Sequence, residues 1–360
     1  MDDRYYMNFA ISLAEKASGQ TSPNPVVGSV IVKDGEIVGF GAHLKAGEAH
    51  AEVNALQMAG DKSKGATVYV TLEPCSHFGK TPPCSDLLIE KKVSRVVIAS
   101  VDPNPLVAGN GIKKLRAAGI SVEIGVCEKE AQRLNMIFFH YIQTKRPFVT
   151  LKTASSLDGK TATVTKKSKW ITSEDARLDV HRYRHQHDAI LVGVETVIAD
   201  NPSLTTRLPN GGKNPIRVVL DTTLRMPSSA KVVTDKEAPT LIVTGSNVNE
   251  EKIHAFESEY VKIIRLSTTK IDVHLLLEQL GQRGITSLFV EGGATVNGSF
   301  LKARAINQLL TYLAPKLIGG SMAPGIIGGE GFETIEECID LEIKEYTMIG
   351  SDLKIVSVPK

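Results

Sequence analysis

The sequence predicts an α/β protein of two domains, and three observations carry that prediction. The chain has 360 residues, which at roughly 150 residues per domain corresponds to two domains. Short β-rich runs alternate with helical patterns along most of the chain, as in layered α/β folds. Around 143–147 (QTKRP) the sequence turns polar and basic, and a strand pattern then starts afresh. We therefore expect one domain over 1–145 and a second over 146–360.

The first domain begins with an amphipathic pattern that ends at Gly19. Asp34 and Gly35 then separate two β-rich runs, which is the signature of a hairpin. Strand and helix patterns alternate after it. The expected elements are a helix at 3–17, a hairpin at 28–41, a helix at 50–59, a strand at 66–72, a helix at about 83–92, a strand at 95–100, and a helix and strand in KKLRAAG and SVEIGV.

In the second domain, β-rich runs recur with helical spacers between several of them. These patterns follow the last helical pattern of the first domain, which is expected to end before Gln143. The expected strands are FVTLKTA, AILVGV, IRVVLD, TLIVTG, KIIRLS and SLFVEGG, and the helical spacers include SEDARLDVHRYRHQ and VHLLLEQLGQRG. This order predicts a second, larger α/β domain.

Composition excludes several classes of protein. Hydrophobic residues make up 42% and charged residues 23%, which is typical of a globular chain and not of a disordered one. A net charge of +2 is too small for a protein held to nucleic acid mainly by phosphate neutralisation. No apolar run reaches the roughly 18 residues of a membrane span, and the start MDDRYYMNFA lacks the features of a secretory signal. We expect a cytoplasmic protein with reduced cysteines.

The most informative cluster combines His50, Cys75 and Cys84. One histidine and two thiolates fill three of the four tetrahedral positions of zinc and leave the fourth for water. Glu52, which is not a ligand in this arrangement, is placed to carry a proton to a leaving amine. The alternative is a structural zinc site, but such sites usually have four protein ligands, and the sequence offers no fourth near this cluster.

The surrounding motifs, HAE at 50–52 and EPCSHFGKTPPC at 73–84, resemble the cytidine deaminase-like family. The sequence departs from that family because eight residues separate the two cysteines. With SPNPVVGSVIV and DPNPLVAGNG, this spacing resembles the riboflavin-pathway deaminase over residues 1 to about 145. The resemblance implies a cytidine deaminase-like domain that removes the exocyclic amine from a diaminopyrimidinone ribosylamine phosphate.

The same resemblance implies a set of contacts to the polar edges and phosphate of the substrate. These residues are Asn24, His43, His77, Lys80, Asp102 and Asn104. Asn24 and Asp102 stand beside prolines, so the alternative for each is an Asx-type turn. The alternative for Lys80 is an ordinary surface lysine.

The second domain lacks both common nucleotide-binding motifs, a GxGxxG after its first strand and a GxxxxGK[ST] loop. VEGGATVNGSF at 290–300 places two glycines between a strand and a helix, where free backbone N–H groups can receive a pyrophosphate. Packing alone also produces such turns. Together with LKTASSLDGKTA, SKWIT and HRYRHQHDAILVGVETVIADNPSLTTR, the motif resembles the riboflavin-pathway reductase over about 146–360. The resemblance implies a dihydrofolate reductase-like fold that uses NADPH.

This second resemblance also implies site residues. The NADPH contacts are Ala154, Trp170, Thr196, Asp200, Thr222, Gly293, Ala294, Thr295, Val296, Asn297, Gly298 and Ser299. The substrate contacts are Ser168, Arg184, Leu204, Arg207 and Glu291.

Turning a ribosylamino group into a ribitylamino group requires hydride at the sugar carbon, a proton donor or electrostatic partner, and a phosphate clamp. Lys152 and Glu291 are expected to end two strands that flank this centre. The guanidinium groups of Arg184 and Arg207 suit binding of a phosphate through two parallel N–H donors. The alternatives are a solvated strand-end lysine for Lys152 and an exposed helix charge for Arg184. The glycine-rich segment 319–329 is expected to be a mobile loop near the ligand.

The sequence thus predicts a bifunctional enzyme with Zn²⁺ and NADPH as cofactors, acting on small phosphorylated pyrimidines. We expect a homo-oligomer without nucleic-acid or membrane partners. One rival is a nucleic-acid-editing deaminase with an accessory module, which the net charge and 5% aromatic content disfavour. The other rival is a deaminase whose second domain is a regulatory nucleotide sensor.

Overall fold

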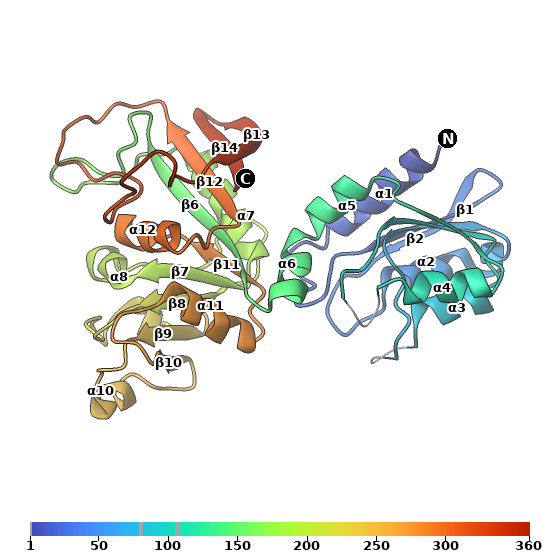
Figure 1. Ribbon diagram of the computed structural model, residues 1–360, viewed down its shortest axis with the longest axis horizontal. Coiled ribbons are helices and arrows are strands. Elements are labelled where there is room, and N and C mark those ends of the chain that lie inside the picture. Colours follow the sequence, from blue (N-terminus) through green and yellow to red (C-terminus); the bar gives the residue numbers. More distant parts are fainter. Residues whose placement is uncertain (1, 79–81, 105–107) are drawn as a thin grey trace. The chain divides into compact units, whose positions relative to one another are not determined.

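The computed structural model describes residues 2–78, 82–104 and 108–360. The chain divides into two compact units, Met1–Lys145 and Arg146–Lys360, and each is described by itself (Figure 1). No helix in the described part of the chain has both the length and the apolar character needed to cross a membrane.

Unit 1 is built on a five-stranded sheet in the order β2-β1-β3-β4-β5. The expected hairpin is confirmed, since β1 and β2 pair antiparallel across Asp34 and Gly35, both at positive φ. β3, β4 and β5 run parallel to one another. The strands are β1 (Gly28–Lys33), β2 (Glu36–Ala42), β3 (Thr67–Leu72), β4 (Arg95–Ser100) and β5 (Ser121–Ile124).

Helices cover both faces of this sheet (Figure 1). Alternate strand residues divide between two apolar clusters, one under α1 and α5 and the other under α2, α3 and α4. Gly28 permits the close approach of α1, because a Cβ there would lie 1.9 Å from the carbonyl oxygen of Ala10. The helices are α1 (Asp3–Glu15), α2 (Ala51–Ala59), the 3-10 turn η1 (Gly60–Ser63), α3 (Cys84–Glu90), α4 (Asn110–Ala117), α5 (Glu128–Leu134) and α6 (Met136–Thr144).

The expectation that the helical pattern closes before Gln143 is wrong. α6 continues through Gln143 to Thr144, whose hydroxyl donates to the carbonyl oxygen of His140. The helix stops at Lys145, which adopts a left-handed conformation with φ of 57°. The chain between α6 and the next strand is therefore only a few residues long.

Unit 2 contains a nine-stranded sheet in the order β10-β9-β8-β7-β11-β6-β12-β14-β13. Neighbours from β10 to β12 are parallel, while β14 pairs antiparallel with β12 and β13. All six expected strands are confirmed, whereas β12 to β14 were not expected. The strands are β6 (Phe148–Ser156), β7 (Ala189–Gly193), β8 (Ile216–Leu220), β9 (Thr240–Thr244), β10 (Val261–Arg265), β11 (Ser287–Val290), β12 (Gln308–Ala314), β13 (Leu341–Ile349) and β14 (Asp352–Pro359).

Two apolar clusters also divide the faces of this larger sheet. One packs α7, α8, α9 and α10 against the sheet, and the other packs α11 and α12. The helices are α7 (Glu174–Gln186), α8 (Val194–Asp200), α9 (Lys231–Thr234), α10 (Glu250–His254), α11 (Val273–Gln282) and α12 (Ala294–Lys302). The neighbouring parallel strands β7 and β11 thus lead into helices on opposite faces, α8 and α12. Open α/β sheets bind ligands at the carboxyl ends of such strand pairs.

Candidate functional sites

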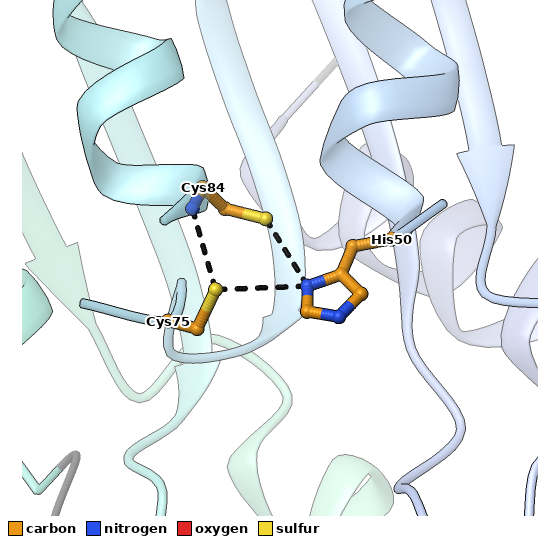
Figure 2. Close-up of side chains that lie close together, drawn as sticks. All are labelled: His50, Cys75 and Cys84. Atoms are coloured by element: carbon orange, nitrogen blue, oxygen red, sulfur yellow. Dashed lines mark hydrogen bonds between the residues drawn. The ribbon is translucent and has the colours of Figure 1, made fainter. Parts of the chain in front are cut away.

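The candidate metal site lies where three segments of unit 1 meet. His50 is the N-cap of α2, Cys84 is the first residue of α3, and Cys75 follows β3. The Nδ1 atom of His50 is 3.2 Å from the Sγ atom of Cys84 and 3.6 Å from that of Cys75 (Figure 2). The fold therefore brings together three side chains that are 34 residues apart at most along the chain.

The spacing of these atoms suits a zinc ion. With Zn–S near 2.3 Å and Zn–N near 2.0–2.1 Å, a tetrahedral ion separates a sulfur ligand from a nitrogen ligand by about 3.6 Å. The three ligand atoms lie within 4.8 Å of one another. A structural zinc site would need a fourth protein ligand, and among the described residues this group holds only these three His, Cys, Asp or Glu side chains. The donor set therefore favours a zinc ion with one open position.

The two thiols differ in acidity. The hydrogen bond with Cys84 and the nearby His50 lower the pKa of Cys75 to about 4, although burial opposes this. The same hydrogen bond, together with burial, raises the pKa of Cys84. The backbone N–H of Cys84 also donates to the Sγ atom of Cys75 at 3.3 Å. Cys75 is thus stabilised as a thiolate, the form that binds a metal ion.

Glu52 lies in the first turn of α2 and is only 3% exposed. Burial and then the negative charge of Cys75 raise the pKa of Glu52 to about 7. A carboxyl group with a pKa near neutral both accepts and donates protons readily. Glu52 does not belong to the group of mutually close ligand atoms. Its position and acidity suit proton transfer beside the metal.

Asn24 and His43 form a pair next to the metal cluster. The His43 Nδ1 atom lies 3.1 Å from the carbonyl oxygen of Ala49, which requires Nδ1–H as the donor. Nε2 is then the acceptor, 3.1 Å from the side-chain amide nitrogen of Asn24. Burial lowers the pKa of His43 and so favours this neutral form. The ring of His43 lies edge-on to that of His50, with centroids 5.3 Å apart. The backbone N–H of Asn24 also donates to the carbonyl oxygen of Thr21, so the chain turns here through a backbone bond while the side-chain amide faces His43.

The other expected substrate contacts of this domain vary in exposure. Asp102 is 8% exposed, and burial raises its pKa. Its Oδ1 atom accepts the backbone N–H of Asn104 at 2.8 Å, so the Asx-type turn is present. His77 is exposed and close enough to influence the acidity of Asp102. Lys80 lies outside the described residues.

Glu73 is a site-supporting residue to which the sequence patterns assigned no role. It follows β3 directly and is only 4% exposed. The available signal was a carboxylate directly after the apolar run of β3, which is buried on both faces. Such a group requires hydrogen-bond donors that come from elsewhere in the fold.

A cavity of about 780 Å³ in unit 2 contains many of the expected reductase residues. It opens beside β6, β12 and α7. The cavity is lined by Lys152, Ala154, Thr161, Ser168, Trp170, Ile171, Thr172, Glu174, Ala176, Arg177, Leu178, Val180, His181, Arg184, Arg207, Leu208, Pro209, Glu291 and Tyr312. Its size is in the range of small-molecule sites.

Lys152, Arg184 and Glu291 form a buried charge cluster on this cavity. The Arg184 Nε and Nη2 atoms donate to the two carboxylate oxygens of Glu291 at 2.6 and 3.1 Å. The Nζ atom of Lys152 is 3.8 Å from Glu291. Burial opposes ionisation of Glu291, but Arg184 and Lys152 outweigh it and hold the pKa of Glu291 at about 2. Burial lowers the pKa of Lys152, and Glu291 only partly offsets that effect.

This cluster corrects one expectation and excludes two alternatives. Lys152 lies inside β6 and not at its end, because β6 runs four residues further to pair with β12. Lys152 is not a solvated lysine, and Arg184 is not an exposed helix charge. The Arg184 guanidinium also donates to the carbonyl oxygen of Thr205 at 3.0 Å, and its role as a phosphate contact stays a prediction.

Arg207 and His181 lie on the same cavity. Within the described residues, no ion pair or side-chain hydrogen bond engages the Arg207 guanidinium, and burial and the charge of Arg184 lower its pKa. The backbone N–H of Arg207 donates to Nδ1 of His181 at 3.2 Å. Burial and the two arginines lower the pKa of His181 to about 4, so the ring is neutral near pH 7. His181, which sequence reasoning missed, is one turn from Arg184 on α7.

The expected NADPH contacts fall into two groups. Ala154 and Trp170 line the cavity, and Trp170 stacks under Arg177 with 4.4 Å between the guanidinium carbon and the ring centroid. Thr196 and Gly293 lie at the facing starts of α8 and α12, since a Cβ on Gly293 would be 3.9 Å from the Thr196 hydroxyl. Asp200 pairs with Lys169 at 3.5 Å. Thr196 and Gly293 therefore lie at the strand ends where α8 and α12 begin, whereas Asp200 is the last residue of α8.

Several residues of this set have other partners. The side-chain amide of Asn297 donates to the carbonyl oxygen of Ile326 at 2.7 Å, and a Cβ on Gly298 would lie 1.9 Å from the carbonyl oxygen of Gly328. Residues 326–328 are thus packed against α12, and the mobility expected of the segment 319–329 stays a prediction. The side chain of Leu204 is buried in the apolar cluster under α7, so only its backbone is available to a ligand.

The remaining expected contacts are distributed along α12 and the neighbouring strand end. Thr222 accepts the backbone N–H of Gly245 through its carbonyl oxygen at 3.0 Å. Ser168 lines the cavity. Ala294 is the first residue of α12, and its carbonyl oxygen accepts the N–H of Gly328 at 2.9 Å. Thr295, Val296 and Ser299 follow in the same helix.

Comparison with protein families matches each unit to a different description. The cytidine and deoxycytidylate deaminase zinc-binding region matches residues 1–100. The RibD C-terminal domain matches residues 147–355. The fold is accordingly a cytidine deaminase-like domain joined to a reductase domain of the dihydrofolate reductase-like class.

Curated relatives resemble nearly the whole chain. The riboflavin biosynthesis protein RibD of Bacillus amyloliquefaciens is 53% identical over 358 residues, covering 99% of this chain and 96% of the relative. RibD of Aquifex aeolicus is 48% identical, covering 98% and 97%. A solved structure of Acinetobacter baumannii RibD is 39% identical with a TM-score of 0.89 and covers 99% of both chains.

A second solved structure carries a more detailed title. It is a diaminohydroxyphosphoribosylaminopyrimidine deaminase/5-amino-6-(5-phosphoribosylamino)uracil reductase from Thermotoga maritima. It is 38% identical to this chain with a TM-score of 0.89, and the alignment covers 99% of this chain and 98% of that one.

Proposed function

Because the chain belongs to the RibD family of riboflavin biosynthesis proteins and is a bifunctional deaminase and reductase that uses zinc and NADPH, we propose which substrates it takes and which residues act. The first substrate is a diaminopyrimidinone ribosylamine 5′-phosphate, which is deaminated by hydrolysis. The second is the deaminated product, whose ribosyl group is reduced to a ribityl group. The convergence of His50, Cys75 and Cys84 beside the buried Glu52 carries the deaminase assignment.

In the deaminase step, Glu52 moves the protons. His50, Cys75 and Cys84 would hold a zinc ion, which when bound would supply the positive charge that makes water nucleophilic near neutral pH. Glu52 accepts a proton from the attacking water and delivers it to the exocyclic amine, so that ammonia leaves, and the remaining hydroxyl proton moves to the ring nitrogen to give the carbonyl. Asn24 and His43 bind the polar edge of the pyrimidine, which their position beside His50 supports.

The zinc assignment is tested by metal analysis of Cys75→Ser. We expect zinc and deaminase activity to be lost together, because a serine hydroxyl is a poor zinc ligand. Cys127→Ser is the matched control, since that buried cysteine lies under α1 and α5, away from the cluster. Full zinc occupancy in Cys75→Ser would contradict the ligand set.

In the reductase step, the charge cluster faces the sugar. NADPH, when bound, would supply the hydride. The ionised carboxylate of Glu291 stabilises positive charge at the sugar carbon after ring opening to an imine, and the ammonium group of Lys152 is the proton donor. Arg207, free of a carboxylate partner among the described residues, binds the phosphate. The glycine-bearing start of α12 with Thr196 holds the dinucleotide, as its place at the end of β11 supports.

NADPH oxidation with the deaminated substrate tests the reductase assignment. We expect turnover by the wild-type chain and, in Arg207→Ala, a KM increase that is much smaller for a dephosphorylated substrate. Equal loss toward both substrates would show that Arg207 makes no phosphate contact. Absence of oxidation in the wild type would favour a regulatory nucleotide sensor.

Homo-oligomerisation and a cytoplasmic location complete the proposal. Four free cysteines support a reducing compartment. Sedimentation measures the oligomeric state directly.

A further inference from the structure

The buried carboxylate of Glu73 joins the segment that carries the metal ligand Cys75 to a distant loop. Its Oε2 atom accepts the backbone N–H groups of Asp102 at 3.4 Å and Gly109 at 2.9 Å. Its Oε1 atom accepts those of Gly111 at 3.0 Å and Ile112 at 3.4 Å. One side chain thus binds the loop after β4 at both ends and the first turn of α4.

The same junction is closely packed. A Cβ on Gly111 would lie 2.2 Å from the carbonyl oxygen of Pro74, so α4 approaches to a distance that only glycine allows. Pro74 immediately precedes Cys75 in the chain. A carboxylate at the start of a helix also meets favourable N–H dipoles. The Glu73 carboxylate and this packing therefore connect Asp102 and the start of α4 to the segment that carries Cys75.

Glu73 is connected in this way, directly or through Asp102, to two of the proposed substrate contacts. Asp102 is attached to Glu73 through its backbone and accepts the N–H of Asn104 with its side chain. Glu73 and the metal ligand Cys75 are two residues apart, so the carboxylate that binds Asp102 and this ligand stand on the same short segment. Glu73 itself is absent from the group of mutually close metal-ligand atoms.

We propose that Glu73 is a positioning residue for the deaminase substrate: it holds Asp102 and Asn104 in register with the metal site without touching substrate or zinc. This proposal rests on the proposed deaminase function. It requires loss of the carboxylate to weaken substrate binding and to spare the metal and the chemical step.

The first test is Glu73→Gln, which keeps the shape but turns one acceptor oxygen into an NH₂ group that faces N–H donors. We expect the KM for the diaminopyrimidinone substrate to rise at least tenfold, kcat to stay within threefold, and zinc to stay stoichiometric. Gly111→Ala, which pushes α4 away from Pro74, should likewise raise KM while kcat and the zinc content stay nearly unchanged. Asp272→Asn, which alters a carboxylate cap on α11, is the matched control and should change nothing.

Hydrogen exchange of the zinc-loaded proteins tests the same contacts of Glu73 in the absence of substrate. In Glu73→Gln, the amides of Asp102, Asn104 and 109–112 should exchange faster, while those of β3 and α3 keep their protection. Unchanged exchange and unchanged KM would overturn the proposal. Zinc loss with a lower kcat at constant KM would also overturn it, because Glu73 would then support the metal. A wild-type protein without deaminase activity would refute the proposed function instead, leaving the exchange result to decide on Glu73.

Discussion

Replacing Glu291 by Gln removes the only carboxylate of the charge cluster in the unit 2 cavity while keeping its shape. Arg184 and Lys152 then remain buried as two cations without their shared counter-ion. A pKa held at about 2, where a free glutamate has 4.5, corresponds to about 3 kcal/mol of stability at neutral pH. For a unit of this size, that loss lowers Tm by roughly 6–12 °C.

The pH dependence of this loss has a definite sign. Because folding lowers the pKa of Glu291, its contribution is complete above about pH 4.5 and disappears as the pH falls toward 2. The stability gap between wild type and Glu291→Gln should therefore be constant from pH 8 to 5.5. Below pH 4.5 it should shrink by about 1.4 kcal/mol per pH unit.

Tryptophan fluorescence during urea unfolding measures this gap, since Trp170 is the single tryptophan of the chain and belongs to unit 2. Glu278→Gln is the control, because its pair with Arg146 is more exposed and contributes at most about 1 kcal/mol. NADPH titration should show cofactor binding preserved in Glu291→Gln while reduction is impaired. Equal stability of the two proteins at pH 7, or a gap that widens in acid, would refute the argument from the buried charge cluster.

Three further substitutions have defined outcomes. Glu52→Gln should retain zinc but lose at least 10²-fold in deamination rate, measured as ammonia release; a near-normal rate would remove Glu52 from the mechanism. Gly28→Ala should destabilise unit 1 by more than 1 kcal/mol in calorimetry, because its Cβ would meet the Ala10 carbonyl oxygen at 1.9 Å; an unchanged transition would contradict that contact. Arg184→Lys should impair reduction despite its retained charge, because lysine cannot form both bonds to Glu291; wild-type kcat and KM would argue against this.

Local patterns predicted most of the regular structure. The hairpin at Asp34 and Gly35 and the six β-rich runs of unit 2 have strong, local signals. The strands β12 to β14 were missed because they complete the sheet by pairing with β6 and with each other. Much of β13 is exposed, so its side chains show no simple inward alternation.

Distant partners explain what the sequence left open at the sites. The HAE and PC motifs predicted the zinc cluster because the chemistry dictates the residue types. The bond between Arg184 and Glu291 joins positions 107 residues apart, and nothing local distinguishes an arginine so engaged from a free phosphate ligand. Glu73 and His181 were missed for the same reason, since their roles come from backbone N–H groups that the fold supplies.

The chain carries two separate proposed sites, with every proposed zinc ligand in unit 1 and every proposed NADPH contact in unit 2. The most direct test is the rate of NADPH oxidation by the full-length protein after zinc removal, with the deaminated substrate supplied. We predict that deamination stops and that reduction continues at the rate of the zinc-loaded protein. Loss of reduction along with zinc, while circular dichroism shows the fold intact, would contradict the two-site account and indicate one composite site.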